Sequence, residues 1–122
     1  MRTSYLLATC IVLLHITDAY ADNHVWIAQT TGEELFKYCR SPDSSPEKAF
    51  CIGFVSAAVS ATSAIFGGNE QRIGCYFSVP DGVSVGRLVE IVDAGLAQNP
   101  SERKQSAIWL TTKYVRDVYP CN

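Results

Sequence analysis

The chain has 122 residues, of which 48% are hydrophobic, and its formal net charge at pH 7 is −2. This length suits one small domain with a real hydrophobic core. The weak net charge, without any run of basic residues, argues against nucleic acid as a partner.

Residues 1–21 have the pattern of a secretory signal peptide. Arg2 gives a short positive start, an apolar stretch follows, and an A-x-A cleavage site ends at Ala21. The apolar stretch is shorter than a typical membrane span. We therefore expect cleavage after Ala21 and an exported domain of residues 22–122 that keeps no membrane segment.

Four of the five cysteines remain after this cleavage, namely Cys39, Cys51, Cys75 and Cys121. An even number in a small exported domain predicts two disulfides formed in an oxidising compartment. Three pairings are possible. We expect Cys39–Cys51, which would close a short helix–loop–helix, and Cys75–Cys121, which would tie the chain end to its middle. A zinc site fits less well, because there is no C-x-x-C and one histidine, His24, remains.

The first expected helix begins after Thr31, where Thr-Gly-Glu-Glu fits a capping box. It should end near residue 39, with an inner stripe of Leu35, Tyr38 and Cys39. A loop rich in serine and proline follows at residues 40–44.

The stretch 45–68 predicts one long central helix. Ser45 can cap its N-terminus, Pro46 suits the first helical position, and glycine at 67 or 68 can end it. Helical spacing predicts an inner face with flanking residues. The face would comprise Phe50, Phe54, Ala57, Ala58, Ala61 and Ile65, and the flanks Cys51, Val55 and Val59.

Residues 67–83 should connect this helix to the next without regular structure. A polar, glycine-bounded loop at 67–74 precedes a short apolar link at 75–79 that lacks a partner strand. Pro-Asp-Gly-Val at 80–83 is typical of a turn, since proline fixes φ and glycine supplies freedom.

Two further helices complete the expected all-α, four-helix domain. Ser84 should cap the third, and Asn99-Pro100 should end it. Its apolar face would comprise Val85, Leu88, Val89, Val92 and Leu96, with Ile91 buried on a second side. Ser101 should cap the fourth, whose inner face would comprise Ala107, Leu110, Thr111, Tyr114 and Val118, with Trp109 and Val115 to the sides. Its solvated face would carry Arg103, Lys104, Lys113, Arg116 and Asp117.

Catalytic chemistry is weakly represented. His24 is the one histidine after cleavage, and no Gly-x-Ser-x-Gly elbow exists. Two acidic pairs, Glu33/Glu34 and Glu90/Asp93, could resemble a glycosidase pair, but helix capping and solvated charge explain them better. We expect neither an enzyme nor a bound cofactor.

We therefore expect the protein to act through binding by its surface. The polar loop at 67–74 presents Asn69, Glu70, Gln71 and Arg72 on a stapled scaffold, and these four are the candidate partner-binding residues. A solvated connector is the simpler interpretation of any single one of them. If Ile91, Trp109 and Val115 were exposed together, they would instead mark an association face.

The order of these pieces resembles the Rap/Tai immunity proteins of type VI secretion systems. The matching segments span residues 32–121 and are 32–39 (GEELFKYC), 51–55 (CIGFV), 80–84 (PDGVS), 88–92 (LVEIV), Asn99-Pro100 and Pro120-Cys121. One position departs. The family pattern places a cysteine two residues before the proline of the turn, where this chain has Ser78, and its cysteine is Cys75.

The resemblance implies a small helical periplasmic protein, commonly a homodimer, that binds a peptidoglycan amidase and blocks its cleft sterically. It implies no catalytic residue. The resemblance also leaves an alternative, an orphan family member with no toxin partner, as would hold for many relatives.

Three different functions would also suit a small exported helical domain. The first is that of a periplasmic acid-stress chaperone, which would expose apolar surface near pH 2 to 3. The second is that of a small enzyme that uses His24. The third is that of a small-molecule carrier, which would need an apolar cavity between its helices.

Overall fold

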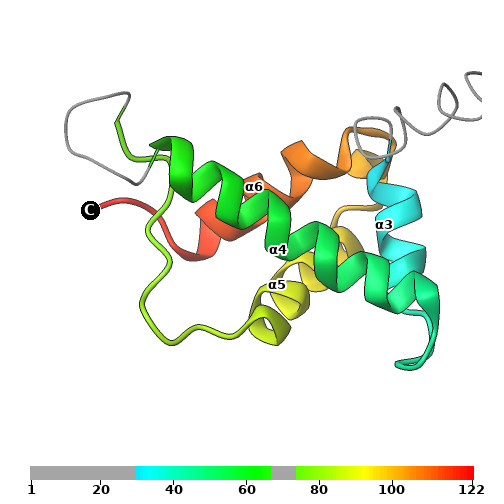
Figure 1. Cartoon of the computed structure of the whole chain (residues 1–122). Helices are drawn as coiled ribbons and strands as arrows, with labels where there is room; N and C mark the ends of the chain where they lie inside the picture. The colour runs from blue at the N-terminus through cyan, green and yellow to red at the C-terminus, as the bar shows by residue number, and fades with distance from the viewer. Residues whose placement is uncertain (1–29, 67–73) are drawn as a thin grey trace, which may run out of the picture.

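The structure is a computed structural model that describes residues 30–66 and 74–122. These residues form α3 (Gly32–Cys39), α4 (Pro46–Phe66), α5 (Val85–Gln98), the 3-10 helix η1 (Pro100–Lys104) and α6 (Ala107–Val118). In Figure 1, α4 crosses in front of α5 and α6, and α3 lies at its N-terminal end. Each of these three helices packs on α4. The expected all-α, four-helix fold is confirmed. The expected signal peptide, residues 1–21, lies outside the described residues.

Side-chain caps begin the first three α-helices as predicted. At α3, Glu34 N donates to Thr31 Oγ1 at 3.3 Å, and Thr31 N donates to a Glu34 carboxylate oxygen at 2.8 Å. The Ser45 and Ser84 hydroxyls each accept the amide three residues further on, both at 3.1 Å. These oxygens satisfy amides that have no partner inside the helix.

The fourth helix begins later than predicted. Ser101 lies within η1, and α6 starts only at Ala107. Between them the chain is extended, because it pairs with the residues before α3. Gly32 N donates to Gln105 O and Ala107 N donates to Thr30 O, both at 2.9 Å. Prediction of a helix start from its capping residue uses only the local sequence, so it cannot detect this backbone pairing between distant segments.

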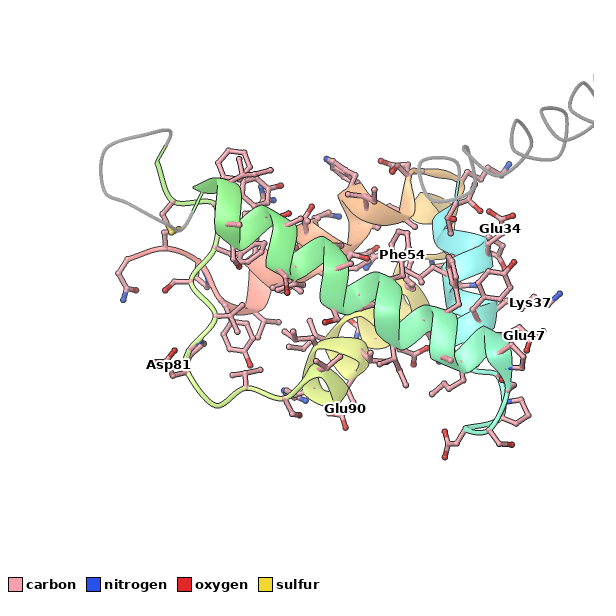
Figure 2. The ribbon with its side chains drawn as sticks, in the orientation of Figure 1. Glu34, Lys37, Glu47, Phe54, Asp81 and Glu90 are labelled. Atoms are coloured by element: carbon pink, nitrogen blue, oxygen red, sulfur yellow. A yellow bond between two sulfur atoms is a disulfide. The ribbon has the colours of Figure 1, made fainter. Side chains whose placement is uncertain are left out.

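The buried face of α4 is rotated from the predicted one. The buried residues are Cys51, Phe54, Val55 and Val59, and Figure 2 shows Phe54 pointing into the body. Of the predicted face, Ala57, Ala61 and Ile65 are exposed. Burying two valines and a bridged cysteine removes more apolar surface from water than burying alanines. The residues expected as flanks therefore form the centre of the core.

The other two long helices follow the prediction more closely. In α5, Leu88, Val89, Val92 and Leu96 are buried, and Ile91 is buried as well. Such two-sided burial arises because α5 contacts both α4 and α6. In α6 the flanks are again reassigned, since Val115 is fully buried and Val118 is exposed.

Residues 74–84 form an irregular strap that crosses the end of the bundle. Phe77 inserts into the core, and Ser78 N donates to Tyr119 O at 2.9 Å. The predicted turn is present, with Val83 N donating to Pro80 O and Gly82 at a φ of 86°. Glycine adopts this positive φ without steric cost.

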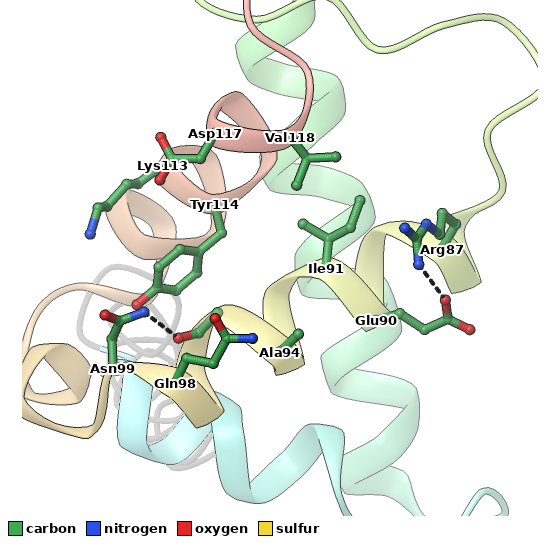
Figure 3. Close-up of a pocket in the computed structure, with 11 residues that line it drawn as sticks. Arg87, Glu90, Ile91, Ala94, Gln98, Asn99, Lys113, Tyr114, Asp117 and Val118 are labelled. Carbon is green, nitrogen blue, oxygen red and sulfur yellow. Dashed lines mark hydrogen bonds and ion pairs between the residues drawn. The ribbon is translucent and has the colours of Figure 1, made fainter.

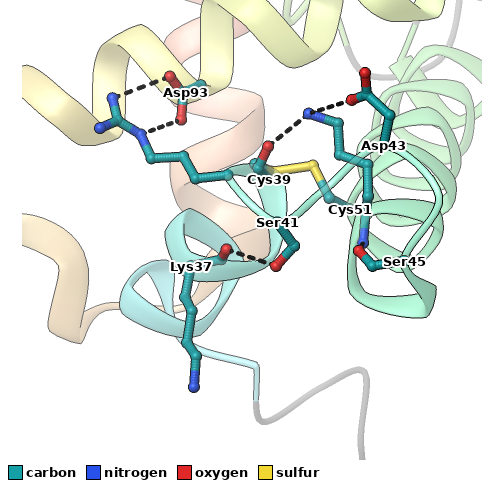
Figure 4. The surroundings of a disulfide bond; sticks show 9 residues. Lys37, Cys39, Ser41, Asp43, Ser45, Cys51 and Asp93 are labelled. Carbon is teal, nitrogen blue, oxygen red and sulfur yellow. Dashed lines mark hydrogen bonds and ion pairs between the residues drawn. A yellow bond between two sulfur atoms is a disulfide. The ribbon is translucent and has the colours of Figure 1, made fainter.

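Both expected disulfides are confirmed, with Cα–Cα distances of 5.1 Å for Cys39–Cys51 and 6.0 Å for Cys75–Cys121. The first is buried, since Cys39 is 3% and Cys51 is 0% exposed. Figure 4 shows it between α3 and the first turns of α4. The Lys48 ammonium donates to Cys39 O at 2.6 Å. In the second bridge, Cys75 is exposed.

This difference in access predicts the order of reduction. Under graded dithiothreitol, Cys75–Cys121 should open at least about tenfold faster than Cys39–Cys51, because thiol–disulfide exchange needs access to a sulfur. Alkylation of the freed thiols followed by mass spectrometry measures both rates. Equal rates, or prior opening of Cys39–Cys51, would contradict the burial difference.

Candidate functional site

The structure describes only the stems of the predicted contact loop. Asn69, Glu70, Gln71 and Arg72 lie outside the described residues. On the described sides of the gap, the rings of Phe66 and Tyr76 lie 5.6 Å apart, and Arg116 lies 5.2 Å from the Tyr76 ring. The Cys75–Cys121 bridge adds a covalent anchor. The two ends of the loop are therefore held together.

Ile91, Trp109 and Val115 are not exposed together, so the condition for an association face at these residues is not met. Ile91 and Val115 are buried, because α5 and α6 pack on each other and on α4, and of the three Trp109 alone is exposed, at 45%. Among the described residues, the large apolar side chains that are exposed are Ile52 and Ile65 in α4 and Ile108, Trp109 and Val118 in α6.

A polar cluster joins η1 to α6. The Lys113 ammonium lies 2.6 Å and 2.8 Å from the two carboxylate oxygens of Glu102, and the Tyr114 hydroxyl donates to the same carboxylate at 3.0 Å. The hydrogen bond from Lys113, followed by that from Tyr114, lowers the pKa of Glu102. Burial, followed by the bond to Glu102, raises the pKa of Tyr114 to about 12.

Two cations expected in a solvated face are thus structural. Lys113 belongs to this cluster. The Arg103 guanidinium donates to Leu96 O at 2.7 Å and lies 3.7 Å from the centre of the Phe36 ring. A cation beside the last carbonyls of α5 is favoured by the helix dipole. Arg103 therefore fixes η1 and α3 to the end of α5.

The Tyr114 ring packs directly on Gly95 of α5. A Cβ added at Gly95 would lie 2.7 Å from Tyr114 Cδ1 and closer still to two other ring atoms. The Tyr114 ring thus occupies the space that the Cβ of any residue other than glycine at position 95 would need. This contact sets the separation of α5 and α6 at the level of the polar cluster.

A groove of about 390 Å³ lies between α5 and α6. Figure 3 shows Tyr114 and Asn99 at one end, Ile91 and Val118 at the other, and α4 behind. The rim charges already have partners in the chain. The Arg87 guanidinium lies 3.1 Å from Glu90, and Lys113 is held by Glu102. The groove is an open, polar-rimmed depression, not the apolar cavity that a small-molecule carrier needs.

The two acidic pairs, which the structure describes in full, do not form a catalytic site. Glu34 caps α3, and Glu33 lies 3.7 Å from Arg103. Asp93 accepts two bonds from Arg40, at 3.0 Å and 3.2 Å, and Glu90 pairs with Arg87. Across residues 30–66 and 74–122, no three His, Cys, Asp or Glu side chains cluster as a metal site would require. His24 lies outside the described residues.

Comparison with known proteins decides what such a scaffold is. A family model described as Rap1a immunity proteins matches residues 31–121. The chain belongs to the Rap1a immunity protein family. The match extends from the capping residue of α3 to Cys121, so it includes every described helix and both disulfides. No curated protein and no solved structure matches the chain.

Membership defines the broad role of the molecule. Proteins of the Rap1a family are immunity proteins and not enzymes, and an immunity protein implies a toxin as its partner. The two disulfides are consistent with residence in the periplasm.

The contact of Gly95 with Tyr114 predicts a large cost for a small change in this Rap1a protein. Gly95→Ala should lower the free energy of unfolding by about 2 to 3 kcal/mol, because the ring must move and open the α5–α6 packing. Gly86→Ala in the same helix is the matched control, since its Cβ would meet only Ser84 Oγ at 3.7 Å. Urea unfolding of both variants tests the prediction, and similar stabilities would contradict it.

The raised pKa of Tyr114 predicts alkaline sensitivity. The pKa of Tyr114 rises from 10.0 in the unfolded chain to about 12 in the folded one, so the fold favours the protonated hydroxyl. The resulting contribution to the free energy of unfolding is at its full size below pH 10. That contribution is lost as pH rises from 10 towards 12. Tyr114→Phe should therefore flatten the fall in unfolding free energy over this interval, as measured by urea unfolding at several pH values. Parallel curves for the two proteins would assign the alkaline loss to other groups.

Proposed function

We propose that this Rap1a protein binds a peptidoglycan amidase delivered by a type VI secretion system and inhibits it in the periplasm by steric exclusion. The observation that carries the proposal is the family match along residues 31–121. It supplies the immunity role, and the resemblance of the sequence to immunity proteins of amidases supplies the class of toxin. Binding, and no chemistry of its own, would be the whole activity.

Export and oxidation fit the place where such a toxin acts. Residues 1–21 would direct the chain across the inner membrane and be removed after Ala21. Cys39–Cys51 and Cys75–Cys121 would then form in the oxidising periplasm. The amidase substrate, peptidoglycan, lies in the same compartment.

The proposed contact is the loop at 67–74, with Asn69, Glu70, Gln71 and Arg72. Its support is the scaffold on either side, where Phe66 contacts Tyr76 and Cys75 is bonded to Cys121. Tying the two ends of a short segment together reduces the conformational entropy that binding must remove. A loop held in this way can enter an enzyme cleft at lower cost than a free one.

A direct experiment combines a pull-down with an amidase assay, using the exported protein and a candidate peptidoglycan amidase effector of a type VI secretion system. One equivalent of the immunity protein should abolish peptidoglycan cleavage. Unimpaired cleavage in the presence of a large excess would overturn the proposal.

Among the four proposed contact residues, Arg72 is the one whose substitution should change amidase affinity most clearly. Arg72→Glu should weaken amidase binding by more than about 1 kcal/mol, since a charge contact buried in a cleft would be reversed. Isothermal titration calorimetry measures the change. Lys104→Glu, at an exposed position in η1, is the matched charge reversal and should leave affinity unaltered. An unchanged affinity for Arg72→Glu would move the contact to another surface.

A further inference from the structure

Two large apolar side chains that follow each other in the sequence are exposed at the start of α6. Ile108 is 39% and Trp109 is 45% exposed, and both belong to the first turn of the helix. We call this pair the α6 patch. Burial of an aromatic side chain is one of the largest apolar contributions to the stability of a small domain. The half-exposed Trp109 makes the α6 patch a candidate docking surface.

We propose that residues 25–29 of the same chain dock on the α6 patch, with Trp26 as the main contact. This segment comes immediately before the described residues, which begin at Thr30. The inference goes beyond the proposed function, because it concerns a surface that the proposed amidase contact does not use. It is supported by the place where the described chain begins and by the order of the apolar residues before that place.

The described chain begins next to the α6 patch. Thr30 O accepts a hydrogen bond from Ala107 N at 2.9 Å, one residue before Ile108, and Thr31 and Ser106 form an antiparallel bridge. Figure 1 shows the start of α3 beside the segment that leads into α6. Thr30 is 7% exposed, so the chain is still packed on the body of the protein at this point.

The antiparallel pairing sets the direction of the residues that precede Thr30. In an antiparallel pair, a step back along one chain is a step forward along the other. The preceding residues are therefore led past Ala107, towards Ile108 and Trp109. Four extended residues span at most about 14 Å, whereas Trp109 lies about 3 Å further along the helix axis than Ala107. Trp26 can thus reach the α6 patch.

The sequence of the segment suits this surface. Residues 25–28 (VWIA) form an apolar run between polar neighbours. Alternate side chains of an extended chain share one side, so Trp26 and Ala28 would share the side of Thr30, which is buried. Ile27 would lie on the opposite side. The alternation therefore directs the tryptophan towards the body and provides a matched control residue next to it.

Covalent attachment favours this occupant over a separate chain. A segment joined to its docking surface by a few residues has an effective concentration in the millimolar range. The charge beside the patch does not oppose an apolar contact, since the Lys113 ammonium is paired with Glu102 and lies 5.5 Å from the centre of the Trp109 ring. The segment can therefore cover the patch without any other protein.

Acrylamide quenching of fluorescence tests the contact on Trp109 itself, because the chain has two tryptophans. In the exported protein with Trp26→Phe, Trp109 is the remaining fluorophore and an aromatic contact is kept. With Trp26→Ser the contact is lost, and Trp109 should be quenched at least about twofold faster. Ile27→Ser combined with Trp26→Phe is the matched control and should quench like Trp26→Phe alone.

Urea unfolding measures the coupling between the two tryptophans. Trp26→Ala and Trp109→Ala should each raise the equilibrium constant for unfolding about tenfold, and the double variant about tenfold in all, not the hundredfold of independent effects. Ile65→Ala, at an exposed isoleucine of α4, is the control on another surface, and its effect should add to that of Trp26→Ala. Circular dichroism verifies that the variants are folded.

Three outcomes would overturn the inference. The first is equal quenching of Trp109 with Trp26→Phe and Trp26→Ser, or additive effects of Trp26→Ala and Trp109→Ala. The second is coupling of Trp26→Ala to Ile65→Ala, which would assign the segment to α4. The third is protection of Trp109 that rises with protein concentration, or that requires a candidate amidase, because the occupant would then be another chain.

Amidase inhibition is a separate readout. Figure 1 shows the start of α6 on the side of α3, whereas the C-terminal end of α4, which the loop at 67–74 follows, lies at the other end of the molecule. Trp26→Ser should therefore inhibit a candidate amidase as well as the wild type does. Equal quenching with normal inhibition would reject the docking of residues 25–29 and leave the proposed function standing. Protected Trp109 without inhibition would do the reverse.

Discussion

The buried bridge between Cys39 and Cys51 fixes how α4 is rotated, and the remaining helices depend on that rotation. A bond from the last residue of α3 to the second turn of α4 admits few orientations of the longer helix. Val55 and Val59 follow Cys51 at helical spacing and are directed into the body. The helices α5 and α6 then pack on the side of α4 that carries these three residues. The opposite side, with its alanines and serines, is left outward.

Local signals in the sequence predicted the local parts of this fold. The caps at Thr31, Ser45 and Ser84 and the turn at Gly82 depend on side chains within a few residues of one another. The rotation of α4 was missed because its composition is apolar nearly all round, so helical periodicity offered two faces of similar weight. The sulfur of Cys51 was the available clue, since a bridged cysteine must face its partner helix.

Long-range contacts account for the other differences. The start of α6 is delayed by backbone pairing between the segments around Gly32 and Gln105. The clusters at Arg103 and Tyr114 join residues from three elements, and a sequence pattern does not bring these together. At the candidate site, the sequence indicated which loop to consider and the structure described its anchors. The groove between α5 and α6 follows only from how the helices pack.

If the chain is exported with its N-terminus first, as proposed, the positions of the two disulfides set an order for their oxidation. The partners of the buried bridge are separated by 12 residues, and both would cross the membrane before α5. Cys75 could form its disulfide only after Cys121 had also been exported. Cys121 is separated from Cys75 by 46 residues and follows α5, η1 and α6. If Cys39 and Cys51 are oxidised first, Cys75 and Cys121 are the two free cysteines left in residues 22–122, and they can bond only to each other. The order in which the cysteines are exported would then be enough to select one of the three possible pairings.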